Sequence, residues 1–297
     1  MTATAGPVLT PGSPEWVRLA TASKVPAMLG LSPYESPFSL WYRMAGLIPA
    51  IEDSDILRRG LFLEPAIVAW WADQHPEMTV LDSETCYYPQ NARFAATPDR
   101  IVRDVDFKGR CLEIKSSDRT GEWGKPGTDE IPVDYRVQAF WQMLCTGTTV
   151  CHVAMLGAYL EFAEYTVHWD QTEADFIRGQ VEAFLDSLPD GRNPQRPSID
   201  SHNATYQAVQ QLHPGINGSD VELDHDLTVA YCTARTRLAA AQADETHTKS
   251  LVADAIGDAK RGRYLDQTIA QRQAKGAGTP YLVAGRNLPT FPQETSP

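Results

Sequence analysis

The order of short strand-like and helical segments between residues 79 and 188 constrains the fold of this chain most strongly. Four short segments rich in β-forming residues and separated by turn residues come first, and the last of them ends at Ser117. A helical pattern over 135–145, two strand patterns over 150–168 and a closing helical pattern over 171–188 follow. This order predicts an α/β fold with one central mixed β-sheet flanked by helices.

The flanking sequence predicts the other parts of the chain. The first fifteen residues are rich in Pro, Gly, Ser and Thr, and we expect a flexible arm over 1–15. A Pro-rich polar stretch after residue 190 sets the expected end of the α/β domain, which then covers 16–190. Residues 191–297 are predicted as a helical C-terminal extension with a basic tail, because an alanine-rich helical pattern is followed over 260–286 by six basic residues and one acid.

The charge and the cysteines limit the classes of function. The 297 residues carry a formal net charge of −12, so nucleic acid would have to be bound through a local basic patch or through cations. No apolar run approaches the roughly 18 residues that a membrane helix needs. The five cysteines form no C-x-x-C pair, which favours reduced thiols and a cytoplasmic setting over a disulfide scaffold or a zinc ribbon.

Several common catalytic motifs do not occur in the sequence. The seven histidines form no H-E-x-x-H pattern, so zincin chemistry is not expected. The sequence contains no G-x-x-x-x-G-K-[ST] phosphate loop and no G-x-S-x-G nucleophile elbow, which argues against an ATP-driven enzyme and a serine hydrolase.

Two carboxylates at the ends of neighbouring predicted strands form the main candidate site. Asp99 lies in TPDR at 97–100, and Glu113 follows fourteen residues later in LEIKSS at 112–117. Both supply oxygen ligands of the kind that a hard divalent cation prefers, and the carbonyl of Ile114 can point at the same cation. Side chains two apart on a strand share a face, which puts Lys115 beside Glu113, where it can orient or help to deprotonate an attacking water. This is the set of groups that metal-dependent phosphodiester hydrolysis requires.

An acid-x-Lys triplet is a weak signal by itself. The chain has three of them, and an exposed strand pair is the simpler interpretation of any one. The triplet that ends at Lys108 runs into a predicted turn, and the one that ends at Lys260 lies in the helical extension. Neither rival has a second carboxylate placed as Asp99 is.

Further polar residues fall at spacings that support this site. Gly60 and Glu64 are four residues apart and share one helix face, so Glu64 would project a third carboxylate, although a solvated glutamate before a proline is the alternative. Tyr135, Gln138 and Gln142 form one polar face on an otherwise apolar helix. Gln138 can reach a phosphate or the lysine; ordinary amides on a half-buried helix are the alternative.

Two features further along the surface stay open at this level. Arg18 and Ser23 place a cation and a hydroxyl near a helix N-terminus, as in a phosphate pocket or on an ordinary surface. The basic tail, with Tyr264 and Tyr281, fits either a DNA contact or a solvated tail.

The combination of these motifs resembles a known family. In order they are RLATASKVPAMLGLSPY, GLFLEP, ATPDR, LEIKSS, EWG and IPVDYRVQAFWQM. They are similar to the YqaJ-type viral recombinase family of the PD-(D/E)XK nuclease superfamily, which includes lambda exonuclease, and the resemblance covers residues 16–190. It implies a restriction-endonuclease-like α/β core.

The resemblance also implies an activity. Enzymes of this kind digest one strand of linear duplex DNA from a 5′ end and leave a 3′ overhang for a single-strand annealing partner in phage recombination. The expected cofactor is Mg²⁺, as two ions, with Mn²⁺ as the alternative. The expected setting is the cytoplasm of a bacterial host, with a phage- or prophage-encoded protein, and a ring-shaped trimer on DNA ends is implied as well.

Roles for individual residues follow from the resemblance only. Asp99, Glu113 and the Ile114 carbonyl would bind the metal, and Lys115 would serve the nucleophile. The remaining residues would complete the active site or bind the 5′-phosphate and DNA: Glu64 and Gln138 in the former role, and Arg18, Ser23, Tyr135 and Gln142 in the latter.

Two other functions remain as alternatives. One is an endonuclease of the same superfamily. The other is a non-catalytic scaffold that binds DNA ends, although such a protein would be expected to have lost one of the acids or the lysine.

Overall fold

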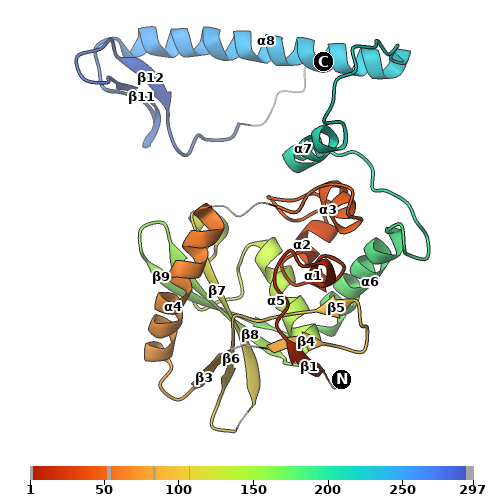
Figure 1. Cartoon of the computed structure of the whole chain (residues 1–297). Coiled ribbons are helices and arrows are strands. Elements are labelled where there is room, and N and C mark those ends of the chain that lie inside the picture. The colour runs from red at the N-terminus through yellow and green to blue at the C-terminus, as the bar shows by residue number, and fades with distance from the viewer. Residues whose placement is uncertain (1–2, 52–54, 83–84, 107, 292–297) are drawn as a thin grey trace. The chain divides into compact units, whose positions relative to one another are not determined.

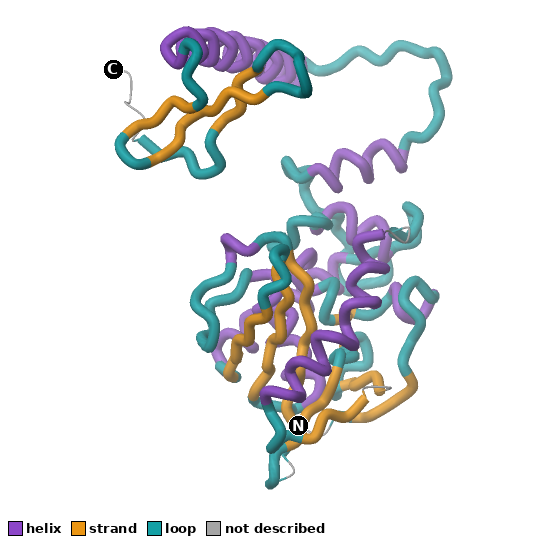
Figure 2. The backbone as a smooth tube through the Cα atoms, turned by 90° about the vertical axis from the view of Figure 1, so that its left-hand side faces the viewer, coloured by secondary structure: helices purple, strands orange, loops and turns teal. Residues whose placement is uncertain are grey.

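The computed structural model describes residues 3–51, 55–82, 85–106 and 108–291. It divides the chain into two compact units, Met1–Ile216 and Asn217–Pro297, which are considered separately below (Figures 1 and 2).

The first unit is built on a five-stranded sheet. Its order is β3 (Thr79–Asp82), β6 (Arg100–Arg103), β7 (Gly109–Ser117), β8 (Val150–Gly157) and β9 (Phe162–His168). All neighbours are antiparallel except β7 and β8. The expected restriction-endonuclease-like core, a central mixed sheet flanked by helices, is therefore confirmed.

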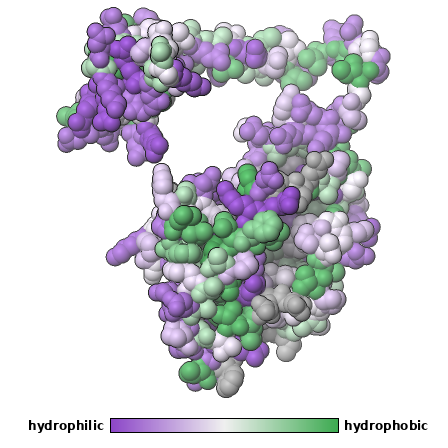
Figure 3. Space-filling view, turned by 60° about the vertical axis from the view of Figure 1, so that its left-hand side comes forward, coloured by the Kyte–Doolittle hydropathy of each residue, from purple (hydrophilic) through white to green (hydrophobic). Residues whose placement is uncertain are grey.

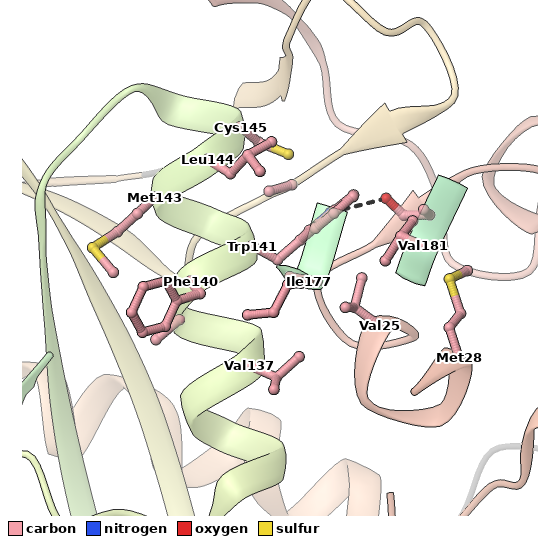
Figure 4. Close-up of a cluster of buried hydrophobic side chains, with 14 of the residues drawn as sticks. Val25, Met28, Val137, Phe140, Trp141, Met143, Leu144, Cys145, Ile177 and Val181 are labelled. Carbon is pink, nitrogen blue, oxygen red and sulfur yellow. Dashed lines mark hydrogen bonds between the residues drawn. The ribbon is translucent and has the colours of Figure 1, made fainter. Parts of the chain in front are cut away.

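Helix α5 (Val133–Thr146) makes the crossover that the parallel pair of strands requires. Its apolar side packs on one face of the sheet and on α6 (Gln171–Ser187), with Trp141 and Ile177 in the shared core (Figure 4). Gly147 ends the helix with a left-handed φ of 76°, a conformation that glycine adopts without steric cost.

Helix α4 (Asp55–Gln74) covers the opposite face of the sheet. Ile67 and Trp71 are fully buried against Leu112 and Ile114 of β7. Strand β7 thus has core on both sides, because its alternate residues point toward α4 or toward α5.

The N-terminal residues are part of the fold. Strand β1 (Thr4–Pro7) pairs with β4 (Thr85–Tyr88), within the stretch that the sequence predicts as a flexible arm. Strand β2 (Ala20–Thr21) runs parallel to β5 (Phe94–Ala95). Both pairings join segments more than seventy residues apart, which local sequence patterns do not encode.

Three short helices complete the N-terminal part of this unit. They are α1 (Pro14–Val17), α2 (Val25–Met28) and α3 (Pro37–Met44). A 3₁₀ turn spans Thr120–Glu122.

The first unit extends beyond the boundary that the sequence suggests near residue 190. Helix α7 (Asn203–Leu212) packs Ala208 against Phe38 of α3 and Ile48. The Thr205 hydroxyl donates a 2.6 Å hydrogen bond to the Ser36 hydroxyl. These contacts place α7 with the first unit, so the division falls after Ile216.

The second unit contains one long helix and a small sheet. Helix α8 (His225–Ile256) buries none of its residues. Strands β10 (Arg261–Tyr264), β11 (Gln267–Gln273) and β12 (Tyr281–Ala284) form an antiparallel sheet in sequence order. The segment expected as a basic tail is thus folded, and the helical extension carries a sheet at its end.

Two observations bear on the setting of the protein. None of the described helices has the length and apolar character needed to cross a membrane. All five cysteines are free thiols; Cys232 is exposed and the other four are buried.

Candidate active site

The elements of the first unit converge on a pocket of about 470 Å³. Strand β6 ends the β6–β7 pairing at Arg100, opposite Leu112, so the backbone of β7 from residue 113 onward is open on that edge. The pocket includes Ser23, Glu64, Asp99 and Gln138 in its lining. Three of the predicted catalytic residues therefore share one cavity with one predicted phosphate-binding residue.

Glu113 is held by donors from two elements. It lies on the face of β7 that α5 covers, and its side chain is only 2% exposed. Lys115, two residues along the same strand, forms an ion pair with Oε1. Gln138 donates a 2.6 Å hydrogen bond to Oε1 and Gln142 donates to Oε2. The period of the strand and the spacing of the helix thus bring together the residues that the sequence proposes, and they fix one carboxylate in one orientation.

Asp99 is anchored on the open edge of β7. Its Oδ2 accepts a 2.7 Å hydrogen bond from the backbone N–H of Ile114. The N–H and C=O of one strand residue leave on the same edge, so the Ile114 carbonyl lies on the Asp99 side of the strand. Loss of hydration and the negative charge of Glu113 raise the pKa of Asp99 well above its usual range, although Lys115 acts in the opposite direction.

Lys115 lies between these two carboxylates. Burial alone would lower the pKa of its ammonium group, but the charges of Glu113 and Asp99 outweigh that effect and raise the pKa. The Nζ atom also lies 4.9 Å from the ring centroid of Tyr135 on α5, a cation–π contact. Lys115 is accordingly charged and fixed from three sides.

Glu64 reaches the pocket from the helix on the other side of the sheet. Its Oε1 accepts a 2.7 Å hydrogen bond from Arg100, the first residue of β6. Arg100 directly follows Asp99 in the sequence. The Glu64–Arg100 ion pair therefore connects helix α4 to the segment that carries Asp99. The negative charge of Glu64 also contributes to the raised pKa of Asp99.

Of the two residues predicted to bind the 5′-phosphate, Ser23 lines the pocket and Arg18 does not. Ser23 is exposed, lines the pocket and lies 3.3 Å from the Thr21 hydroxyl. Arg18 is the exposed C-cap residue of α1 and is not among the residues that line the pocket. A role for Arg18 in binding phosphate stays a prediction.

Lys24 is a structural feature of the pocket wall that the sequence analysis missed. Its buried Nζ donates hydrogen bonds to the carbonyls of Val17 and Leu19, at 3.1 and 2.9 Å. It also lies 3.6 Å from the ring centroid of Trp16. Burial lowers the pKa of Lys24 to about 7, against a smaller opposing effect of Glu35. Since Trp16 and Leu19 line the pocket, Lys24 holds part of its wall in place.

Arg119 is a second residue that the sequence analysis did not identify. It follows β7 and donates a 2.8 Å hydrogen bond to the buried carboxylate of Asp134. Its guanidinium lies 4.9 Å from the Tyr135 ring and 5.8 Å from the Tyr34 ring. Lys115 contacts the same Tyr135 ring, so Arg119 places a second cation beside the candidate site. The only sequence signal was an arginine four residues after the lysine.

The donor set fits a hard divalent cation. No cluster of three His, Cys, Asp or Glu side chains within the described ranges is arranged to hold a metal ion. Asp99, Glu113 and the Ile114 carbonyl nevertheless offer oxygen atoms at one edge of β7, and the mutual repulsion that raises the pKa of Asp99 is the kind that a cation relieves.

Known proteins with similar structures include nucleases. The alkaline exonuclease LHK-Exo from Laribacter hongkongensis is 23% identical, with 58% of this chain and 88% of that chain covered and a TM-score of 0.45. Its complex with dAMP is also 23% identical, with 59% and 89% covered and a TM-score of 0.45. A phage-related exonuclease from Haemophilus somnus 129PT is 14% identical, with 56% and 92% covered and a TM-score of 0.44.

A search of curated protein sequences gives no match. A family model does match, over residues 16–149, a range that contains most of the pocket lining, Asp99, Glu113, Lys115 and the two glutamines of α5. The model that matches is that of the YqaJ-like viral recombinase domain, so the chain is similar to this family over residues 16–149.

Proposed function

We propose that the chain is a metal-dependent exonuclease that digests linear double-stranded DNA in the 5′→3′ direction. Removal of one strand would leave a 3′ single-stranded overhang for phage-type recombination. The similarity of residues 16–149 to the YqaJ-like viral recombinase domain supports a nuclease that acts in recombination.

The arrangement of side chains around β7 is the main observation behind this proposal. The Asp99 carboxylate accepts a hydrogen bond from the Ile114 N–H, and Glu113 forms an ion pair with Lys115 on the same strand. Two acids and a lysine at one strand end supply the oxygen ligands and the proton-handling group that hydrolysis of a phosphodiester requires.

Each of these residues would have a separate role in phosphodiester hydrolysis. Asp99, Glu113 and the Ile114 carbonyl would hold Mg²⁺, as one or two ions, with Mn²⁺ as the alternative. A bound divalent cation offsets the negative charge that develops on the phosphate and makes an attacking water more acidic. The charged Lys115 orients that water and the scissile phosphate through its N–H groups, while Gln138 keeps the Glu113 carboxylate in place.

Recognition of the DNA end would use residues in and beside the pocket. Ser23 and Arg18 are proposed to bind the 5′-phosphate, and Tyr135 to support the DNA-facing side of the site. Gln142, predicted from the sequence as a DNA contact, is buried and donates to Glu113, so it would act through that carboxylate. A single-strand annealing protein would take over the 3′ strand. A ring of identical subunits and a place in the cytoplasm of a phage-infected bacterium complete the proposal.

The test uses linear duplex DNA with one 5′-phosphorylated end and a separate label on each strand, beside a covalently closed circle. With Mg²⁺ we expect loss of the 5′-ended strand only and no cutting of the circle. EDTA and Lys115→Ala are each expected to abolish the loss.

Each other outcome points to a different function. Cutting of the closed circle would indicate an endonuclease. Binding of DNA ends without any hydrolysis would indicate a non-catalytic scaffold and would refute the roles given to Asp99, Glu113 and Lys115. Loss of the 3′-ended strand first would reverse the proposed direction.

A further inference from the structure

The small sheet of the second unit concentrates positive charge in an acidic protein. Residues 260–286 contain six basic residues and one acid, whereas residues 217–259 contain three basic residues and eight acids. The net charge of the whole chain is −12. Any interaction of this unit with a polyanion is therefore confined to the sheet.

The strand register gathers four of these cations at one end of the sheet. Arg261 on β10 lies opposite Gln271 on β11, and the N–H of Arg272 donates a 2.9 Å hydrogen bond to the carbonyl of Lys260. Lys275 follows β11 by two residues, at the same end. Tyr281, the first residue of β12, lies opposite the last residue of β11 and adds an exposed aromatic ring there. We name Lys260, Arg261, Arg272, Lys275 and Tyr281 the basic end of the sheet.

Few carboxylates neutralise the basic end. Arg272 donates to the carbonyl of Gly257 at the end of α8 and lies 3.6 Å from a carboxylate oxygen of Asp258. Within the described part of the chain, no ion pair or side-chain hydrogen bond is found for the exposed side chains of Lys260, Arg261 and Lys275. These three charges are available to an external anion.

We propose that the basic end of the sheet binds the sugar–phosphate backbone of duplex DNA, independently of sequence. The proposal rests on the function proposed above, which supplies the DNA, and it gives the second unit a substrate-holding role. Duplex DNA carries one negative charge per about 1.7 Å of helix axis, so a short row of unpaired Lys and Arg finds phosphates in any register.

The chemistry of the surface favours DNA over an acidic protein partner. Protein interfaces concentrate binding energy in buried apolar or aromatic anchors. The side chains exposed at this end are Lys, Arg, Gln and one Tyr, and hydrophilic residues cover the strands of this unit (Figure 3). Phosphate contacts from cations need no apolar anchor.

The test compares two full-length triple variants with the same change in net charge. The first carries Lys260→Gln, Arg261→Gln and Lys275→Gln. The control carries Arg235→Gln, Arg237→Gln and Lys249→Gln on the equally exposed helix α8. Binding to a labelled covalently closed duplex is measured in EDTA over a series of salt concentrations, so that neither DNA ends nor hydrolysis contribute.

We expect the first variant to bind at least about tenfold more weakly at low salt. The slope of its plot of log affinity against log salt should be smaller in magnitude by about 2 to 3, because each lost phosphate contact removes about 0.9 from the slope. The control variant should match the parent protein. Equal losses in both variants would show a bulk charge effect and would overturn the proposal, as would an unchanged salt slope in the first variant.

A single-residue pair keeps the test valid if the triple variant folds poorly. Lys275 lies outside the strands, so its substitution should not disturb the sheet. Lys275→Gln should weaken binding about two- to fivefold, and Lys275→Arg should not. Equal effects of the two variants would argue against a charge contact. Hydrolysis of a short end-labelled duplex is measured separately. If the parent protein fails to hydrolyse DNA but the triple variant still loses binding, the proposed exonuclease function fails and the DNA contact stands.

Discussion

At the residue scale, Asp99 shows a conflict between folding and function. Its carboxylate lies close enough to Glu113 and Glu64 for both to raise its pKa, and the surrounding protein removes much of its hydration. In the absence of a divalent cation, this arrangement opposes folding at neutral pH. The same repulsion gives the site affinity for a cation, so Asp99 should be costly to the metal-free protein and required by the active one.

We therefore predict that Asp99→Asn stabilises the metal-free protein while it abolishes hydrolysis of DNA. At pH 7 the variant should therefore unfold at a higher urea concentration than the parent protein. A raised pKa in the folded state means that the unfolded state loses its proton first as the pH rises, so the penalty develops above the unfolded pKa near 4 and disappears in acid. Urea unfolding at pH 7 and pH 3.5 in EDTA measures both values.

Asp104→Asn is the matched control for this substitution. Asp104 pairs with Arg110 at 2.9 Å. Burial opposes its charge, but the backbone and side-chain hydrogen bonds together outweigh burial and lower its pKa. That substitution should leave stability unchanged or reduce it. Addition of Mg²⁺ should raise the melting temperature of the parent protein and of Asp104→Asn but not of Asp99→Asn; a Mg²⁺ response that persists in Asp99→Asn would contradict its role as a ligand.

A second prediction at this scale separates the site lysine from an ordinary one. Lys115→Ala should lower the rate of hydrolysis by about 10²–10⁴-fold, the range typical of a positioned proton-transfer or charge-stabilising group, with little change in DNA binding. Lys108→Ala removes the lysine of a competing acid-x-Lys triplet and should leave the rate within about twofold. Single-turnover rates and binding measured separately distinguish the two effects, and equal rates for the two variants would exclude a catalytic role for Lys115.

Short-range periodicity explains which of the proposed site residues lie together, although Gln142 was expected at the DNA and instead donates to Glu113. The period of two on a strand pairs Glu113 with Lys115, and the helical spacing of Gln138 and Gln142 brings both amides to the same carboxylate. Lys24 and Arg119 were missed because their partners are set by the paths of irregular segments. The carbonyls around Lys24 come from the end of a four-residue helix that carries no periodic signal.

At the element scale, a cluster of titratable groups connects the end of α4 to the sheet. Glu164 on β9 accepts a hydrogen bond of 2.7 Å from His75, just after α4, and one of 3.0 Å from His152 on β8. Burial opposes the charge of Glu164, but the hydrogen bonds from the two histidines outweigh it and lower its pKa to about 2. Burial likewise opposes the charge of His75, and Glu164 outweighs it and raises the pKa of His75.

We predict that Glu164→Gln destabilises the protein most between about pH 5 and pH 6.5. The depressed pKa of Glu164 gives stability that is present above its unfolded pKa near 4.3 and is lost as the pH falls toward 2. The raised pKa of His75 gives stability that is present below its unfolded pKa near 6.5 and is lost as the pH rises through the folded value. The group is partly exposed, so the loss should be about 1–2 kcal/mol near pH 5.5 and smaller at pH 9.

Urea unfolding of the variant and parent at pH 5.5 and pH 9 checks this prediction. Glu77→Gln is the control, because Glu77 is 56% exposed and meets the same histidine at 3.3 Å. It should leave stability nearly unchanged at both pH values, because an exposed ion pair contributes little. If Glu164→Gln lost the same stability at pH 5.5 and pH 9, the effect would come from packing and not from the charge of His75.

Helices and strands with a strong local sequence pattern could be predicted, whereas strands without such a pattern could not. Helix α5 and strands β7 to β9 have strong periodic patterns, and their positions agree with the sequence within a few residues. Strand β1 was not foreseen because its partner β4 lies about eighty residues away and its own sequence is rich in small residues. Strands β10 to β12 were not foreseen because polar and basic residues occupy both faces, which hides the alternation that identifies a half-buried strand.

At the scale of the whole molecule, the two units differ in how they are stabilised. The first unit has a sheet with core clusters on both faces. In the second unit, α8 has no buried residue over its 32 positions, and the sheet buries Ala270 alone among the core hydrophobics. An isolated helix gains most of its stability from packing of an apolar face, so the second unit should open far more often than the first.

We predict that hydrogen exchange separates the two units. Amides of β7 and β8 should exchange with the slowest rates in the chain, and amides in the middle of α8 should exchange at least about 10²-fold faster, because their local opening requires no loss of core contacts. Exchange followed by proteolysis and mass spectrometry measures both regions in one experiment. On addition of closed circular duplex DNA in EDTA, protection should increase in residues 260–284 and in the last turns of α8, which Arg272 connects to the sheet. If α8 were as protected as β7 without DNA, the helix would have a partner in solution, and a dependence of that protection on protein concentration would identify the partner as a second copy of the chain.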